Sequence, residues 1–302
     1  MTTVSVLVED IGVGVETLCA RLGVPEPRPQ SFRSGRGIDA VFCRVHPKYA
    51  VAPTFLELVA PAALDDGSAD EAVFPVAQIA ARQGDRSVKW HATEISMPAP
   101  MLLDLSAHLR LLGVRHGFVP ADRQDRFFMG GDPAIEYDRD ADAGLIIEAG
   151  RSEHLGLPEN AFTAPADIPA DAEPSTMVRI VAREYLVDDL EATLRILERN
   201  LRWMPESVRE DAGCRRAIMP FRMPRSARLE LVEPVGSGRA AEAYEEVGAG
   251  AWTIRVSVVD VEAKAADLAA RDTAFSLRDG VLLPSPETTL GVPFEFVSVR
   301  EN

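Results

Sequence analysis

Four glutamates in this 302-residue chain each stand between apolar residues at the end of a strand-like segment. Alternation along a strand turns such a carboxylate to one face of a sheet, while its apolar neighbours occupy the other face. A carboxylate held inside a protein needs a cation, a metal or several hydrogen-bond donors. The recurrence therefore predicts two concave sites, one in each half of the chain, suited to acid–base or metal chemistry. The residues are Glu57 in LEL, Glu148 in IEA, Glu230 in LEL and Glu295 in FEF.

One histidine stands where it can join two of these glutamates. His91 opens the strand-like run 91–97, and with Glu57 and Glu148 it would supply one imidazole and two carboxylates. Such a set suits a divalent ion (Zn, Ni, Mn, Co or Fe) with positions left for substrate oxygens. The ion would polarise a carbonyl while Glu57 or Glu148, as the catalytic group, moves a proton. Because a histidine on a strand is also commonly a hydrogen-bonded core residue, a site without any metal stays open.

The second half of the chain favours metal chemistry less. Residues 155–302 contain no histidine, so a site with two histidines and one carboxylate cannot be assembled there. Glu230 and Glu295 are instead candidates for substrate binding or for acid–base work without a metal. Trp90 and Trp252 stand at similar places in the two halves and would either wall an apolar pocket or pack in the core.

Arginines gather near the last strand of the third strand-rich segment. Arg216 is the candidate among them for binding an anionic substrate, because a guanidinium matches carboxylate and phosphate oxygens. A solvated sheet edge that discourages pairing explains the same cluster. The cluster comprises Arg215, Arg216, Arg222, Arg225 and Arg228.

The composition favours a small molecule, rather than nucleic acid or a membrane, as the binding partner of this protein. The net charge is −15 and the pI about 4.8, which disfavours nucleic acid because an acidic surface repels phosphate backbones. Three cysteines without paired spacing predict reduced thiols and a cytoplasmic location. No charged leader precedes an apolar run, and no window reaches the ~18 apolar residues of a membrane span. A monomer and a homodimer both remain open.

The residues with chemistry are set in a repeated pattern of strand, helix and several short strands. Asp10, Asp188 or Asp189, and Asp260 are predicted to cap the helices of three such modules. The segments FLELVAP (55–61) and RLELVEP (228–234) repeat one another. The Pro-, Ala- and Asp-rich stretch 159–176 reads as a linker. The expected domains are therefore 1–158, with modules 1–65 and 86–150, and 177–302, with modules 177–235 and 250–302.

One long segment carries a family resemblance. Arg228–Glu262 reads RLELVEPVGSGRAAEAYEEVGAGAWTIRVSVVDVE. It is similar to the passage that joins two modules in epimerase-like members of the vicinal oxygen chelate superfamily, and the likeness covers most of the chain. The resemblance implies an α+β fold, with four βαβββ modules paired into two curved mixed-sheet, glyoxalase-like domains. We assume that adjacent modules pair, the first with the second and the third with the fourth.

The resemblance also implies positions for ligands. Metal-binding members place one ligand early in each module's first strand and a glutamate near the end of its last strand. The early positions here would be Thr3, His91, roughly Ala182 and Thr253, of which only His91 is a strong ligand. Thr3 and Thr253 remain substrate-binding candidates.

The sequence thus favours a glyoxalase-like, divalent-metal-dependent lyase, isomerase or epimerase that acts next to a carbonyl. The alternative is a metal-free protein of the same fold that binds drug-type small molecules, because three early positions lack a strong ligand. An extradiol-type dioxygenase fits less well, because the second half has no histidine.

Overall fold

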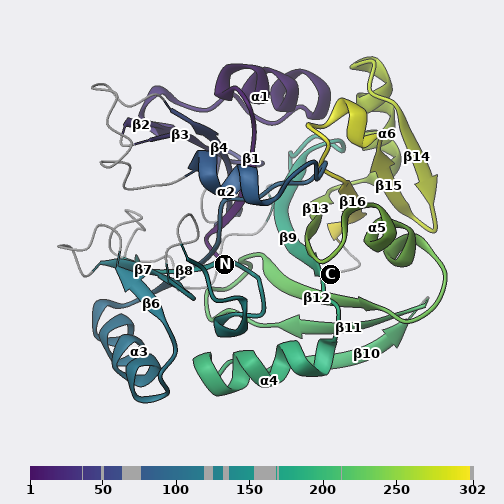
Figure 1. Cartoon of the computed structure of the whole chain (residues 1–302). Coiled ribbons are helices and arrows are strands. Elements are labelled where there is room, and N and C mark those ends of the chain that lie inside the picture. The colour runs from purple at the N-terminus through teal and green to yellow at the C-terminus, as the bar shows by residue number, and fades with distance from the viewer. Residues whose placement is uncertain are drawn as a thin grey trace.

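The computed structural model describes residues 1–35, 37–48, 51–62, 76–118, 125–131, 136–152, 168, 170–211 and 213–299. Four units follow one another along the chain, each with a strand, a helix and three further strands (Figure 1). The first unit comprises β1 (Thr3–Leu7), α1 (Ile11–Thr17), β2 (Phe32–Gly35), β3 (Ile38–Cys43) and β4 (Phe55–Pro61). The second comprises β5 (Thr93–Met97), α3 (Ala99–Leu111), β6 (His116–Phe118), β7 (Arg126–Met129) and β8 (Ile147–Arg151).

The second half repeats this order. The third unit comprises β9 (Met177–Leu186), α4 (Leu190–Leu201), β10 (Ser207–Asp211), β11 (Cys214–Met219) and β12 (Arg228–Pro234). The fourth comprises β13 (Gly250–Val258), α6 (Val261–Ala270), β14 (Phe275–Arg278), β15 (Val281–Pro284) and β16 (Phe294–Ser298). The short helices α2 (Val76–Arg82) and α5 (Arg239–Val247) join the two units within each half.

The first helix of three units begins at the aspartate predicted from the sequence. Asp10, Asp189 and Asp260 each have extended backbone and accept a hydrogen bond from the backbone N–H three residues on. Such a cap satisfies one of the N–H groups that a helix leaves without an internal partner. The second unit differs, because Pro98 precedes α3 and no side chain caps that helix.

Each unit pairs its first strand parallel to its last strand. The described sheets have the orders β1-β4-β3-β2, β5-β8-β7-β6 and β10-β11-β12-β9-β13-β16-β15-β14. The antiparallel pair of β9 and β13 fuses units three and four into one eight-stranded mixed sheet, as expected from their adjacency. Units one and two form separate four-stranded ladders in the described residues. They adjoin where the Leu7 N–H donates to the Lys89 carbonyl (3.0 Å) and the Ser5 hydroxyl to the Ala92 carbonyl (2.8 Å).

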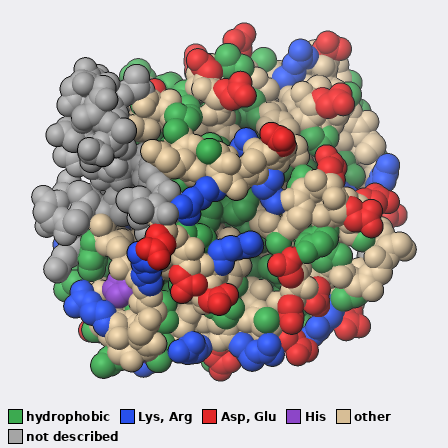
Figure 2. Space-filling view, in the orientation of Figure 1, with side chains coloured by type: hydrophobic (Ala, Val, Ile, Leu, Met, Phe, Trp, Pro, Cys, Tyr) green, Lys and Arg blue, Asp and Glu red, His purple; other side chains and the backbone are tan. Residues whose placement is uncertain are grey.

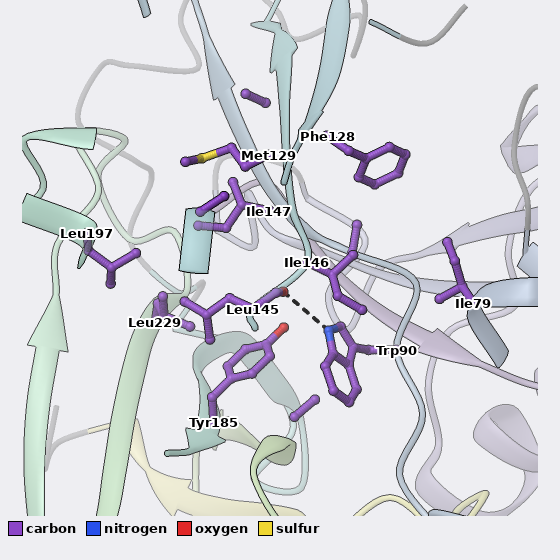
Figure 3. Packing of buried hydrophobic residues seen from close by; sticks show 14 of the residues in the cluster. Ile79, Trp90, Phe128, Met129, Leu145, Ile146, Ile147, Tyr185, Leu197 and Leu229 are labelled. Carbon is purple, nitrogen blue, oxygen red and sulfur yellow. Dashed lines mark hydrogen bonds between the residues drawn. The ribbon is translucent and has the colours of Figure 1, made fainter. Parts of the chain in front are cut away.

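Buried apolar side chains from both halves share the core. One cluster combines Phe128 and Ile147 of the second unit with Tyr185 and Leu197 of the third (Figure 3). A second cluster combines strands β1 and β4 with β13 and β16. Most of the predicted linker, 159–176, lies outside the described residues. No helix in the described part of the chain is both long and apolar enough to cross a membrane.

Candidate functional site: two clusters of glutamates

The parallel pairing in each unit places one residue directly beside each of the four predicted glutamates. These partners stand two or three positions after Thr3, His91, Ala182 and Thr253, the early positions that the family resemblance implied. Residues paired in register on adjacent strands point to the same face of the sheet. The pairs are Ser5–Glu57, Glu94–Glu148, Glu184–Glu230 and Arg255–Glu295.

In the N-terminal half, the charge of one guanidinium acts on three carboxyl groups and pairs with one of them. The Arg126 Nη1 donates to Glu148 Oε1 at 3.1 Å, reaching it diagonally from β7. Glu148 is buried, with 6% of its surface exposed, whereas Glu57 and Glu94 are half-buried. Solvent therefore reaches two members of this group. We call Glu57, Glu94, Glu148 and Arg126 the N-terminal cluster.

The N-terminal cluster favours protonated carboxyl groups. The pKa of Glu57 lies well above its usual value, first because protein surrounds it and then because Glu94 and Glu148 repel its charge. The pKa of Glu94 is raised by burial and by Glu148, although the Thr3 and Ser96 hydroxyls oppose the shift. Burial also raises the pKa of Glu148, and Arg126 is the main influence in the opposite direction. The three groups thus differ in how strongly a cation holds them ionised.

His91 lies beside this cluster in its neutral form. Its side chain is buried and its ring packs edge-on against Phe128, with 6.0 Å between the ring centroids. Phe128 pairs in register with Glu148. Burial and the charge of Arg126 lower the pKa of His91 to about 4. A neutral imidazole can bind a metal ion or exchange a proton.

The donor types around His91 suit a divalent metal, because imidazole and carboxylate oxygens are common ligands of Zn, Ni, Mn, Co and Fe. The side chains do not converge as such a site, however. Within the described ranges, no three His, Cys, Asp or Glu side chains come together so that they could hold a metal ion. The predicted set Glu57, His91 and Glu148 is therefore not preformed in this structure.

The C-terminal half also holds three carboxylates, here all buried, and arginines form ion pairs with all of them. Arg216 Nη1 contacts Glu230 Oε2 at 2.7 Å and also pairs with Glu184. Arg255 pairs with Glu184, with Glu230 at 3.2 Å and with Glu295 at 2.9 Å. Arg239, from α5, adds a second partner to Glu295. We call these six residues the C-terminal network.

Burial and charge balance separate the two groups. Glu184 and Glu230 are 0% exposed and Glu295 is 5% exposed, and three arginines compensate them. Arg255 and Arg239 hold the pKa of Glu295 below its usual value despite burial. Arg216 on β11 lies diagonally opposite Glu230, just as Arg126 on β7 lies diagonally opposite Glu148. Arg255 pairs in register with Glu295, whereas the residue that pairs in register with Glu57 is the uncharged Ser5. The N-terminal cluster lacks that second cation.

The remaining predicted site residues lie deeper in the protein. Trp90 is 4% exposed and donates from Nε1 to the Leu145 carbonyl, and Trp252 is 5% exposed beneath Arg239. Thr3 is buried next to Glu94. Thr253 is 0% exposed on β13, and its hydroxyl has no hydrogen-bond partner among the described residues. Trp252 thus contacts the C-terminal network through Arg239, whereas Trp90 belongs to the shared core.

Sequence reasoning missed Glu94, Glu184, Arg126 and Arg255. Each lies on the same sheet face as a predicted glutamate and either pairs with it in register or reaches it diagonally. The available signal was the alternation of β5, β9 and β13 once their register with the last strand of the unit is known.

Comparison with known proteins supports the fold. No protein-family model and no curated protein matches the chain. A mutant of 4-hydroxymandelate synthase from Streptomyces coelicolor superposes with a TM-score of 0.57 at 14% identity, covering 98% of this chain and 91% of that one. This likeness spans nearly the whole chain and shows the two-domain, glyoxalase-like fold expected from the sequence.

Smaller proteins match about half of the chain. Methylmalonyl-CoA epimerase from Mycobacterium tuberculosis has a TM-score of 0.35 at 19% identity and covers 43% of this chain and 92% of its own. The Streptomyces coelicolor epimerase in complex with 2-nitronate-propionyl-CoA has a TM-score of 0.36 at 20% identity, covering 41% and 99%.

Replacing Glu57 by glutamine should stabilise the protein at high pH. A carboxyl group with a raised pKa binds more protons when folded, so its contribution to stability falls as pH rises from its unfolded to its folded pKa. Glu57→Gln removes that loss, and we expect Tm to rise by roughly 2–4 °C at pH 8, the shift that about 1 kcal/mol produces. At pH 4 the two proteins should differ little. Glu198→Gln, at an exposed position, is the control, and a lower Tm for Glu57→Gln at pH 8 would contradict the assignment.

Removing the central cation of the C-terminal network should destabilise the protein strongly. Arg255→Met leaves Glu184, Glu230 and Glu295 short of a partner, and breaking a buried ion pair in this way costs about 3–5 kcal/mol. Arg215→Met, which removes more exposed pairs with Glu191 and Glu233, should cost at most about 1 kcal/mol. Urea unfolding of both variants measures the difference. Equal losses of unfolding free energy in the two variants would show that the C-terminal network stabilises the protein no more than the exposed ion pairs do.

Proposed function

We propose that this protein is an enzyme that moves a proton next to a carbonyl of a small molecule, and that the reaction takes place in its N-terminal half. The observation that carries the proposal is the N-terminal cluster: three carboxylates with raised pKa values, two of them half-buried, around one arginine. Acid–base catalysis needs carboxyl groups with displaced pKa values that a substrate can reach.

The environments of Glu57 and Glu148 assign them different roles. Glu148 is paired with Arg126, which favours its ionised form and makes it the proton acceptor. The pKa of Glu57 is raised by two neighbouring carboxylates and is lowered only weakly by Arg126. Glu57 therefore keeps its proton more readily than Glu148 and is the proton donor. Two carboxyl groups whose surroundings separate their protonation states in this way form an acid–base pair.

Arg126 and His91 complete the arrangement. The side chain of Arg126 is 34% exposed, and its guanidinium is proposed to donate hydrogen bonds to a substrate oxygen as well as to Glu148. Such a donor stabilises the negative charge that develops on a carbonyl oxygen when the adjacent carbon loses its proton to Glu148. Glu57 then supplies a proton. Its transfer to a carbon of the enolate gives an isomerase or epimerase, whereas its transfer to a neighbouring group, as the enolate electrons expel that group, gives a lyase.

A divalent metal is a second candidate component of the same site. Three carboxylates and a neutral His91, with Arg126 as the one arginine that the described residues place among them, favour an added cation. Glu57, His91 and Glu148 would hold the ion after rearrangement of their side chains, and the bound ion would act as a Lewis acid toward the substrate carbonyl. The roles of Glu57, Glu148 and Arg126 do not depend on it.

Exchange of substrate protons with solvent tests the acid–base proposal. In D₂O, proton NMR of 2-oxo acids, 2-hydroxy ketones and 2-methyl thioesters should show enzyme-dependent loss of the signal next to the carbonyl. Glu148→Gln should lower the exchange rate by about 10²–10⁴-fold, the usual contribution of a general base. Activity should fall at low pH, where Glu148 is protonated, and at high pH, where Glu57 is ionised. Glu57→Gln should lose the high-pH fall, and Glu198→Gln should behave like wild type. Wild-type exchange in Glu148→Gln would refute the role of this cluster.

Elemental analysis of gently purified, untagged protein tests the metal separately. If the ion is present, we expect about one Zn, Ni, Mn, Co or Fe per chain, lost in both His91→Ala and Glu148→Ala. Glu198→Gln should retain it. Equal metal content in all four proteins would eliminate this ligand set, and the proton-transfer proposal would then rest on the exchange experiment alone.

A further inference from the structure

A buried arginine lies where the two halves of the protein meet. Successive residues of β9 point to opposite faces of the sheet, so Glu184 joins the C-terminal network while Arg183 and Tyr185 face the N-terminal half. Tyr185 Oη is hydrogen-bonded to Thr93 Oγ1 at 2.7 Å. The Tyr185 ring also packs edge-on against Trp90, with 5.9 Å between ring centroids (Figure 3). We call the region formed by Arg183, Tyr185, Thr93 and Trp90 the joint.

Arg183 forms no ion pair with a carboxylate among the described residues, although Tyr185 and the charge of Glu184 partly oppose the lowering of its pKa by burial. Its side chain is 1% exposed, and none of its three guanidinium nitrogens has a hydrogen-bond partner among the described residues. Its guanidinium carbon lies 5.8 Å from the centroid of the Tyr185 ring. A buried charge is normally paired and hydrogen-bonded, because removing it from water is costly. The position therefore suits a further acceptor beyond those that the described residues supply.

Two further arginines extend the positive charge of the joint toward solvent. Arg86 is half-buried over the Trp90 ring and donates to four neutral carbonyls, those of Val88, Val247, Ala249 and Ala251. Burial, and then the charges of Arg183 and Arg139, lower the pKa of Arg86 below its usual value. Arg139 is exposed. Within the part of the chain that the structure describes, these three arginines form no ion pair with a carboxylate.

This arrangement contrasts with the rest of an acidic protein. The chain has a net charge of −15, and the C-terminal network on the other face of β9 pairs each of its arginines with glutamate. In Figure 2, Lys and Arg side chains border a hollow near the middle of the face shown. The exposure of the three arginines decreases from Arg139 through Arg86 to Arg183.

We propose that the joint binds a small oxyanion, a phosphate or carboxylate group, held by Arg183 with Arg86 nearer the surface. The planar fork of a guanidinium matches two oxygens of such a group. The site is separate from the N-terminal cluster, because Thr93 faces Tyr185 while its neighbour Glu94 pairs with Glu148 on the other face of β5. A bound anion would connect β9 of the second half to the segment before β5 of the first, and so favour the association of the two halves.

Thermal unfolding with inorganic phosphate tests the proposal. At constant pH and ionic strength, with sodium gluconate as the balancing salt, wild-type Tm should rise saturably with phosphate, by about 2–4 °C at roughly tenfold above Kd. Arg183→Met should show no saturable rise. Its Tm without phosphate should equal or exceed that of wild type, because an unpaired buried charge has been removed. Arg179→Met, on the same strand but hydrogen-bonded to the Arg225 carbonyl, is the matched control and should respond like wild type.

Crystals of the wild-type protein soaked in sodium selenate provide a second test that needs no variant. Anomalous scattering should place selenium with its oxygens in hydrogen-bonding reach of the Arg183 guanidinium. Three results would each overturn the proposal: a phosphate response in Arg183→Met equal to that of wild type, only water beside Arg183, or selenium only at surface positions. If Arg183→Met does not fold, the selenate position decides alone.

Discussion

The parallel pairing of first and last strands within each unit determines where charge lies in this protein. It sets one residue of the first strand beside a glutamate of the last strand, four times along the chain. Register is strongly fixed here, because a slip by one residue would move the apolar neighbours of each glutamate to the charged face. The chemistry of each half then depends on which residue occupies the position beside the glutamate.

The two halves differ at that position. In the second half, Arg255 stands beside Glu295 and reaches three glutamates, so carboxylates that would be costly to bury ionised are held by matched cations. In the first half, Ser5 stands beside Glu57 and brings no charge, and its hydroxyl is engaged with Ala92. The same scaffold thus produces a closed ionic network at one site and a group of carboxyl groups with raised pKa values at the other.

The sequence predicted the unit order, the caps at Asp10, Asp189 and Asp260, and the fold, because these depend on local patterns of apolar residues and turns. It did not identify the partners of the four glutamates. Counting back from the caps assumes equal strand geometry, whereas β13 has an irregularity between Ala251 and Ile254. Glu94 and Arg255 hold the same position, beside the glutamate of the last strand. Glu94 lies four residues after Trp90 but Arg255 lies three residues after Trp252, so an alignment on the tryptophans does not reveal that these two positions correspond. The predicted role of His91 as a ligand remains a hypothesis.

The alternation of β9 connects the closed network to the joint. Glu184 and Arg183 are adjacent in sequence, yet Glu184 pairs with two arginines whereas the Arg183 guanidinium has no hydrogen-bond acceptor among the described residues. Because their side chains leave opposite faces of the strand, Glu184 cannot turn to neutralise Arg183 without abandoning Arg216 and Arg255. The charge at the joint is therefore a consequence of the same strand register that forms the C-terminal network, and this is the charge that the proposed oxyanion would neutralise.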